Sequence, residues 1–135
     1  MTIYHHILKN SYQRAVIPDY AGFFNRFYQI LLAADDEVAV LFANTDVERQ
    51  SKMLMQSMTH ILSFAHTLEA DENMEKLALL HGRDRLNISK EFYSIWLDSL
   101  IKTVSERDLQ FDPHVETAWR VLMAPGIEYM KSFCD

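Results

Sequence analysis

The chain has 135 residues, 49% of them hydrophobic, and a formal net charge of −6. This is enough for one globular domain with a real core. The acidic balance excludes the basic surface that nucleic-acid binding requires, and no stretch is long and apolar enough to cross a membrane. One cysteine, Cys134, cannot form an internal disulfide. Without a visible signal-peptide pattern, these features predict a cytoplasmic protein.

Apolar residues recur at three- and four-residue spacing over residues 18–34, which predicts a helix that begins near Pro18. The expected buried stripe of this helix consists of Tyr20, Phe24, Phe27, Tyr28 and Leu31. Asp35 and Asp36 interrupt the pattern, and a short helical turn is expected to follow as far as Phe42.

A second long helix is expected over residues 45–66. Thr45 precedes Glu48 by three residues, a spacing that predicts a capping box at the start of this helix. Its inward side should carry Val47, Leu54, Met58, Ile61 and Ala65. The acidic segment from Glu69 to Glu75 is expected to be a solvated connection.

Three more helices are expected in the second half of the chain, and together these elements predict an all-α fold of six or seven helices. A short one should carry Met74, Leu77, Ala78 and His81 and end at Gly82 as a left-handed cap. A long one should begin after Ser89, with Phe92, Tyr93, Trp96, Leu100 and Val104 inward. The last should begin at Asp112-Pro113, with Val115, Trp119, Leu122, Met130 and Phe133 inward. Pro125-Gly126 is expected to kink or interrupt it.

Six histidines in a short chain are the first sign of chemistry. None follows a glutamate at the Glu-x-x-His spacing of di-iron bundles, and no Cys/His cluster has zinc spacing. His5, His6 and His114 are expected to be exposed, and His60 and His66 to be solvated or partly packed near the end of their helix. His81 differs because it lies on an apolar stripe, although a histidine there is more often a core residue than a ligand.

The sequence as a whole resembles globins, especially single-domain bacterial haemoglobins and the globin domain of flavohaemoglobins. The resemblance rests on consistently spaced positions along nearly the whole chain: Phe27-Tyr28, Phe42, Gln50 and Leu54 within residues 45–54, His81, Glu91-x-Tyr93 and Ala118-Trp119. It implies one globin domain over residues 1–135, with a globin-like fold of six or seven helices around a haem pocket.

The same resemblance implies the site. His81 would be the ligand of the iron in haem b, with its other ring nitrogen donating to the backbone carbonyl of Leu77. Phe42, Leu54, Leu77 and Tyr93 would contact the cofactor, and Tyr28, Gln50 and Leu54 would face the bound gas. One or two of four basic residues are expected to pair with the haem carboxylates: Arg49, Lys52, Arg83 and Arg85.

The function that the resemblance implies is reversible binding of O₂ or another diatomic gas such as NO or CO, for storage or delivery. Detoxification of NO as a dioxygenase would need an external reductase, because no reductase pattern is visible in the chain. We expect a monomer or homodimer, without nucleic-acid or membrane partners. The alternative is a haem-free, globin-like helical module for interaction or sensing, in which His81, Phe42, Tyr28 and Gln50 serve only packing or lie at the surface.

Overall fold

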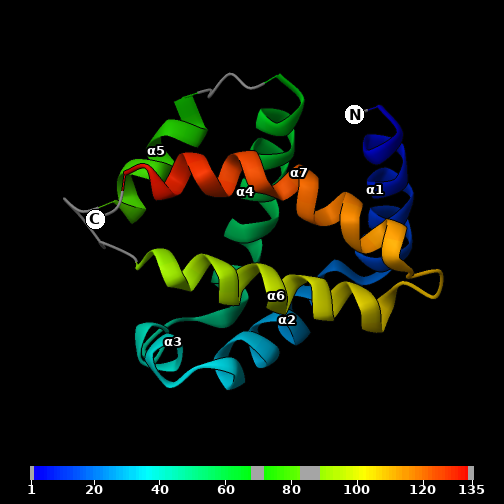
Figure 1. Cartoon of the computed structure of the whole chain (residues 1–135). Coiled ribbons are helices and arrows are strands. Elements are labelled where there is room, and N and C mark those ends of the chain that lie inside the picture. The colour runs from blue at the N-terminus through cyan, green and yellow to red at the C-terminus, as the bar shows by residue number, and fades with distance from the viewer. Residues whose placement is uncertain (1, 68–71, 83–88, 134–135) are drawn as a thin grey trace.

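The computed structural model describes residues 2–67, 72–82 and 89–133, and within them the chain is all-α, as predicted (Figure 1). These residues form seven α-helices, one 3-10 turn and no strand. The elements are α1 (Thr2–Ala15), the 3-10 turn η1 (Ile17–Asp19), α2 (Tyr20–Ala34), α3 (Asp36–Leu41), α4 (Val47–Thr67), α5 (Glu72–His81), α6 (Lys90–Arg107) and α7 (Pro113–Lys131). No described helix is both long and apolar enough to span a membrane.

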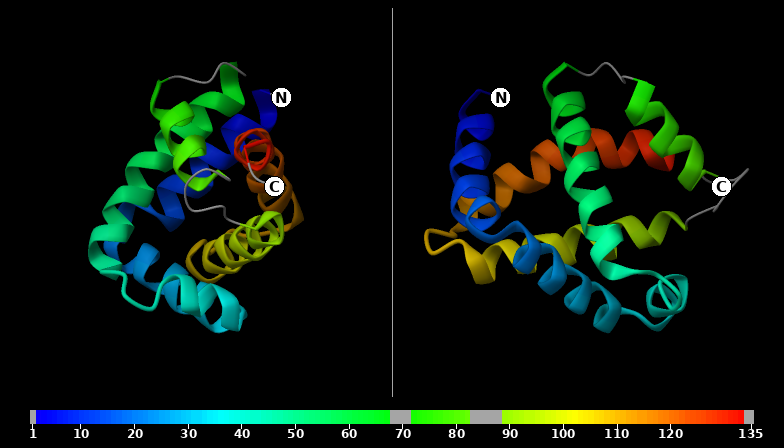
Figure 2. Two further views of the ribbon diagram at one scale, coloured as in Figure 1. Left: turned by 90° about the vertical axis from the view of Figure 1, so that its left-hand side faces the viewer. Right: turned by 180° about the vertical axis from the view of Figure 1, so that it is seen from behind.

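The helices cross one another in pairs rather than forming a parallel bundle (Figure 2). α1 packs against α7, α2 against α6, and α4 against α7. The core at these crossings is rich in aromatic and long apolar side chains, and its largest fully buried members include Phe23, Phe24, Phe27, Trp119 and Met123. Tyr20 was expected in the buried stripe of α2, but it is 46% exposed because the buried face of α2 begins only at Phe23.

Helix α1 is the element that periodicity did not predict. Its buried positions are Leu8, Ser11 and Ala15, so the middle of its inward stripe is a polar residue. The Ser11 hydroxyl accepts a hydrogen bond of 2.9 Å from the indole nitrogen of Trp119 in α7. This hydrogen bond with Trp119, 108 residues away in the sequence, therefore offsets the free-energy cost of burying the Ser11 hydroxyl.

Aspartates cap several helices. Asp35 accepts from the backbone N–H of Glu37 and Val38 at the start of α3, and Asp112 accepts from Val115 at the start of α7, as expected there. The predicted capping box of α4 is wrong, because the residue that caps this helix is Asp46 and not Thr45. Its carboxylate accepts from the N–H of Glu48 at 3.1 Å and Arg49 at 3.3 Å.

The neighbouring Thr45 belongs to the preceding turn, where its N–H donates to the Phe42 carbonyl at 3.1 Å. A carboxylate is also the stronger acceptor at the positive end of a helix dipole.

Ser89 precedes α6 as expected, but its hydroxyl donates to the Glu91 carboxylate rather than capping the backbone. Part of the predicted acidic connection, Glu72 to Glu75, is helical and begins α5, whereas residues 69–71 lie outside the described ranges.

Helix α7 continues through Pro125 without the interruption that was one of the two expected outcomes. Pro125 has no backbone N–H to donate to the preceding turn. The glycine that follows it is required by packing. A β-carbon on Gly126 would lie 2.8 Å from Cγ2 of Ile61 in α4 and 3.4 Å from Cε of Met74 in α5. Glycine therefore lets α4 approach α7 closely.

Gly82 follows the end of α5 as predicted, but its backbone is not left-handed, so the expected reason for it is wrong. The requirement is steric. A β-carbon at Gly82 would lie 2.7 Å from the backbone oxygen of Phe133 and 3.1 Å from its Cβ. The end of α5 thus lies directly against the residues that follow α7.

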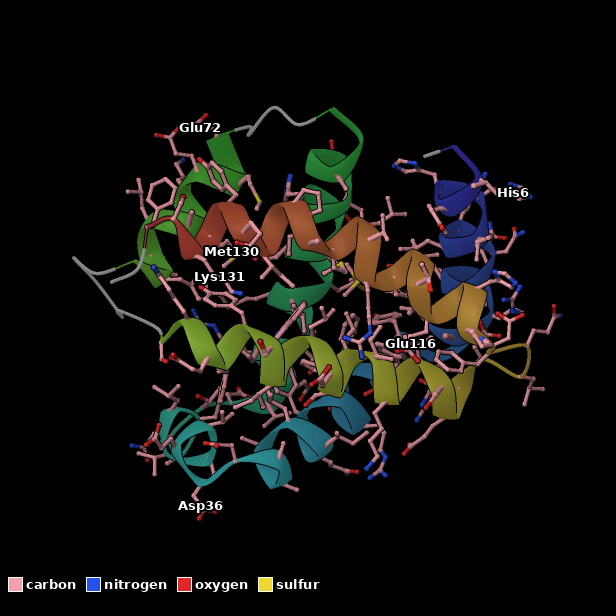
Figure 3. All side chains as sticks on the ribbon, in the orientation of Figure 1. His6, Asp36, Glu72, Glu116, Met130 and Lys131 are labelled. Atoms are coloured by element: carbon pink, nitrogen blue, oxygen red, sulfur yellow. The ribbon has the colours of Figure 1, made fainter. Side chains whose placement is uncertain are left out.

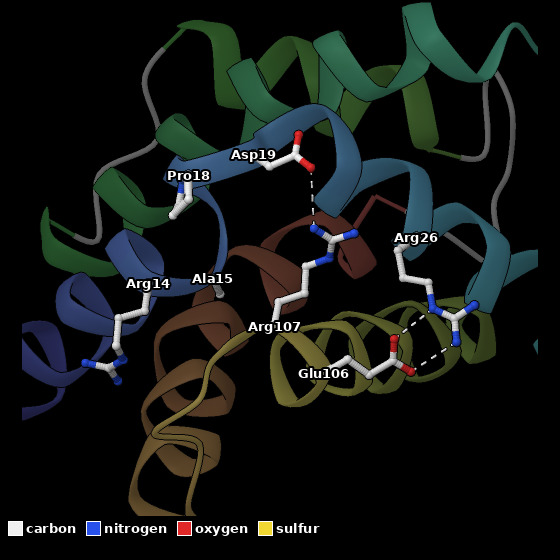
Figure 4. A pocket seen from close by; sticks show the side chains of 7 residues that line it. All are labelled: Arg14, Ala15, Pro18, Asp19, Arg26, Glu106 and Arg107. Carbon is white, nitrogen blue, oxygen red and sulfur yellow. Dashed lines mark hydrogen bonds and ion pairs between the residues drawn. The ribbon is translucent and has the colours of Figure 1, made fainter.

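Arginine–carboxylate pairs join η1 and α2 to the far end of α6, where they line an open groove (Figure 4). Arg26 binds Glu106 through two hydrogen bonds of 2.7 and 3.1 Å. Arg107 lies 3.7 Å from Asp19. Each of these two guanidinium groups has a carboxylate partner, so the arginines at this groove form ion pairs between neighbouring elements.

Candidate functional site

A second cavity, of about 210 Å³, opens between the helices and shares no lining residue with this groove. Its lining comes from α2, α4, α5, α6, α7 and Phe42, the residue that follows α3. The lining residues are mainly apolar or aromatic: Tyr28, Phe42, Gln50, Met53, Leu54, Ser57, Ile61, Leu80, His81, Phe92, Tyr93, Trp96, Ile127 and Met130. Such a lining suits a flat apolar ligand held by a few polar groups.

Six of the seven residues singled out from the sequence meet at this cavity: Tyr28, Phe42, Gln50, Leu54, His81 and Tyr93. The seventh, Leu77, belongs to α5, but its side chain lies outside the described part of the structure. The structure therefore brings these residues together, whereas their roles toward a cofactor stay predictions.

His81 is the last residue of α5 and reaches the cavity half-buried. Two residues of its helix, Met74 and Ala78, are fully buried and hold α5 to the core. The close contact of Gly82 with Phe133 fixes the helix end one residue after the imidazole. Among the lining residues, His81 is the one that carries a nitrogen ligand suitable for a transition metal.

Tyr28 and Gln50 form a polar pair at the cavity. Tyr28 is 3% exposed and comes from α2, while Gln50 comes from the first turn of α4. Burial raises the pKa of the Tyr28 hydroxyl, and hydrogen bonding with the Gln50 side chain lowers it by less. The phenol therefore stays protonated at neutral pH and can act as a hydrogen-bond donor.

An aromatic wall joins α2 to α6 across the cavity. The rings of Tyr28 and Phe42 have centroids 5.8 Å apart, and those of Phe42 and Phe92 lie 6.4 Å apart, both tilted. Phe92 and Tyr93 then meet edge to face at 5.7 Å. These spacings are in the range in which aromatic pairs attract one another. Phe42, which follows the short helix α3, is thereby held at the cavity by rings from two other helices.

Comparison with known proteins identifies the fold. No protein-family model and no curated protein matches the chain. A crystal structure from Pseudomonas aeruginosa, of a protein described as structurally highly homologous to a human haemoglobin, is similar over 98% of this chain and 99% of that one. The sequence identity is 31% and the TM-score is 0.87. The chain belongs to the family of this globin-like protein. The predicted globin fold is confirmed, and the narrower likeness to flavohaemoglobins stays a prediction.

Sequence reasoning missed several residues that line the cavity of this globin. Met53 and Ser57 lie on the same face of α4 as Gln50, Leu54 and Ile61. The spacing of three, four and seven residues from Gln50 would have indicated both. Leu80 and Ile127 carry no such signal, because only the packing of α5 and α7 brings them to the cavity.

The basic and remaining histidine residues of the globin lie mostly away from the cavity. Arg49 and Lys52 are exposed on α4 and do not line it, and Arg83 and Arg85 lie outside the described ranges. His6 and His114 are exposed, as expected, and His6 lies on the outer side of α1 (Figure 3). His5 was expected to be exposed but is half-buried, with its Nε2 atom buried. His60 is half-buried, in keeping with the partly packed position expected for it, and the His66 side chain is outside the described part. Among described residues, no three His, Cys, Asp or Glu side chains cluster as a metal site would require.

Proposed function

We propose that this globin binds haem b in the cavity and, through it, reversibly binds O₂ or another diatomic gas such as NO or CO. One observation carries the proposal. A single cavity collects the imidazole of His81 from α5 and the hydrogen-bonding pair of Tyr28 and Gln50 from α2 and α4, within an otherwise apolar lining.

The lining residues fit the chemistry of haem, a flat and largely apolar group whose iron needs a donor atom from the protein. The aromatic wall of Tyr28, Phe42 and Phe92 offers flat apolar surface. His81 offers an imidazole, a common nitrogen ligand of iron and other transition metals. The cavity is smaller than the roughly 300–1,000 Å³ of typical ligand sites. Met53 and Leu80, 45% and 42% exposed on its rim, are side chains that can move aside to widen it.

When bound, haem would supply an iron atom that can bind an imidazole nitrogen and a small gas molecule. His81 would hold the iron through one ring nitrogen, and its other nitrogen would donate to the Leu77 carbonyl one turn back. Tyr28 O–H and the Gln50 amide would donate to the gas. Their buried surroundings strengthen such hydrogen bonds because the local dielectric is low. Leu54, Phe42 and Tyr93 would restrict the space by packing.

Storage or delivery of a gas needs binding alone, and the residues at the cavity supply what binding requires. Turnover of NO would also need electrons, which we propose to come from an external reductase if this activity exists. The two roles separate in one assay: consumption of NO by the O₂-loaded chain in a single turnover, and repeated turnover only after a reductase is added.

An absorption spectrum tests the proposed function. The purified full chain, alone and after addition of hemin, is measured oxidised, reduced and reduced with CO. We expect a sharp Soret band that shifts on reduction and again with CO. A colourless chain that also fails to take up added hemin would support the haem-free helical module instead.

A further inference from the structure

Met53 is unusual among the methionines that the structure describes. It lines the cavity and is also 45% exposed, on the outer edge of α4. Met55, two residues on, is half-buried and does not line the cavity. The others are buried to 6% exposure or less: Met58, Met74, Met123 and Met130. Among these methionines, the Met53 side chain is therefore the most open to oxidants in the solvent.

We propose that Met53 is a peroxide-sensitive modification site at the cavity mouth, and that its oxidation to the sulfoxide loosens the hold of the cavity on its ligand. The effect on the ligand rests on the proposed function, whereas the selective oxidation does not. The thioether sulfur attacks one oxygen of hydrogen peroxide, the O–O bond breaks, and an S–O bond forms. After proton transfer the second oxygen leaves as water, so that sulfur loses two electrons and peroxide gains them.

The position of Met53 on α4 gives its sulfoxide a direct effect on the polar pair. Gln50 precedes Met53 by three residues, and both line the cavity, so the two side chains are neighbours on one helix face. The new S=O oxygen is a hydrogen-bond acceptor, which competes with Tyr28 for the Gln50 side chain. It also replaces an apolar, flexible group on the rim with a polar one, which costs free energy when a ligand covers it.

Peptide mapping tests the selectivity. The full chain, before hemin is added, is treated with increasing amounts of hydrogen peroxide, and sulfoxide is measured at each methionine from 53 to 130. We expect Met53 to be oxidised first, Met55 later, and Met58, Met74 and Met123 last. Oxidation of Met55 or of a buried methionine as early as Met53 overturns the proposal.

Hemin transfer tests the consequence. The treated and untreated chains are loaded with hemin, and its loss to excess apomyoglobin is followed. We expect peroxide to raise the rate of hemin loss by about threefold or more, in the range that burial of an added polar group produces. This peroxide effect should vanish in Met53→Leu and persist in the matched control Met55→Leu.

An equal peroxide effect in both variants overturns the inference while leaving haem binding intact. A chain that takes up no hemin overturns the proposed function and the loosening with it, and the peptide map then still decides whether Met53 is the selective site.

Discussion

Gly126 of α7 and Ile61 of α4 are so close that a β-carbon on the glycine would lie 2.8 Å from Cγ2 of the isoleucine. Ile61 and the residue after the glycine, Ile127, both line the cavity. The tight crossing of two helices therefore sets part of the cavity wall, and the absence of one side chain permits it.

Gly126→Ala should destabilise the protein despite the better helix propensity of alanine. Alanine gains about 0.5–1 kcal/mol in a helix interior. Overpacking a tight core contact costs about 1–3 kcal/mol, and Ile61 is β-branched and cannot easily turn away. Urea unfolding should show a net loss of stability. The loss should shrink or reverse in the Ile61→Ala background, which removes the clashing methyl group; a cost unchanged there would place the strain elsewhere.

Tyr28→Phe should raise the dissociation rate of O₂ from the reduced, hemin-loaded chain by about tenfold or more. The variant removes one buried hydrogen-bond donor, and a hydrogen bond to a charged acceptor contributes about 1.5–3 kcal/mol. Stopped-flow release measures the rate. Tyr20→Phe is the matched control, because Tyr20 lies in the same helix and is 46% exposed. Unchanged release in Tyr28→Phe would show that its hydroxyl does not contact the gas.

His81→Ala should abolish stable haem binding, since no other described residue that lines the cavity carries an imidazole. The measurement is the spectrum and the hemin-loss rate of the variant, with His114→Ala as the exposed control. Free imidazole added to His81→Ala should partly restore the parent spectrum if the cavity keeps its shape. Retention of the parent spectrum without added imidazole contradicts the ligand assignment.

Asp108→Asn should destabilise the protein at neutral pH. Asp108 has a fully buried side chain and accepts hydrogen bonds of 2.6 and 3.0 Å from Arg14. Burial raises the pKa of Asp108, but hydrogen bonds from Arg14, Ser11 and the Gln110 backbone outweigh it, and the net shift is downward. Loss of the charged partner should cost about 1.5–3 kcal/mol.

The pH dependence of this loss follows from the sign of the shift. A carboxyl whose pKa is lower in the folded state contributes full stability above its unfolded pKa of about 3.9, and loses it as pH falls through the folded value. Unfolding by urea at several pH values should therefore show the wild type and Asp108→Asn converging below pH 4. A difference that stays constant down to the folded pKa would contradict the charge argument. Glu106→Gln, in an exposed pair with Arg26, should show a much smaller loss at pH 7.

Most helices could be predicted because their signals are local. Apolar spacing and Pro18 locate α2 within a few residues, and apolar spacing and the capping Asp112 locate α7. Helix α1 was not predicted because its buried face contains the polar residue Ser11, whose burial depends on Trp119, far away in the sequence. The structural roles of Gly82 and Gly126 could not be predicted either, because both glycines are required by close contacts with residues that lie far away in the sequence.

The candidate site was predicted only through the resemblance to globins. Considered alone, Tyr28, Gln50 and His81 have ordinary structural explanations, because nothing local shows that three different helices bring them together. The part that sequence could have supplied is the cavity-facing side of α4, where Met53 and Ser57 follow Gln50 at helical spacing. The contributions of Leu80 and Ile127 needed the packed structure.

The contact between Gly82 and Phe133 has a practical consequence for making this protein. Phe133, the last residue that the structure describes, packs against Gly82, and Gly82 directly follows the proposed iron ligand His81. A fused segment that displaced Phe133 would therefore also shift the His81 imidazole. An affinity tag or a fused fluorescent domain is therefore best joined ahead of α1, which does not contribute to the cavity lining.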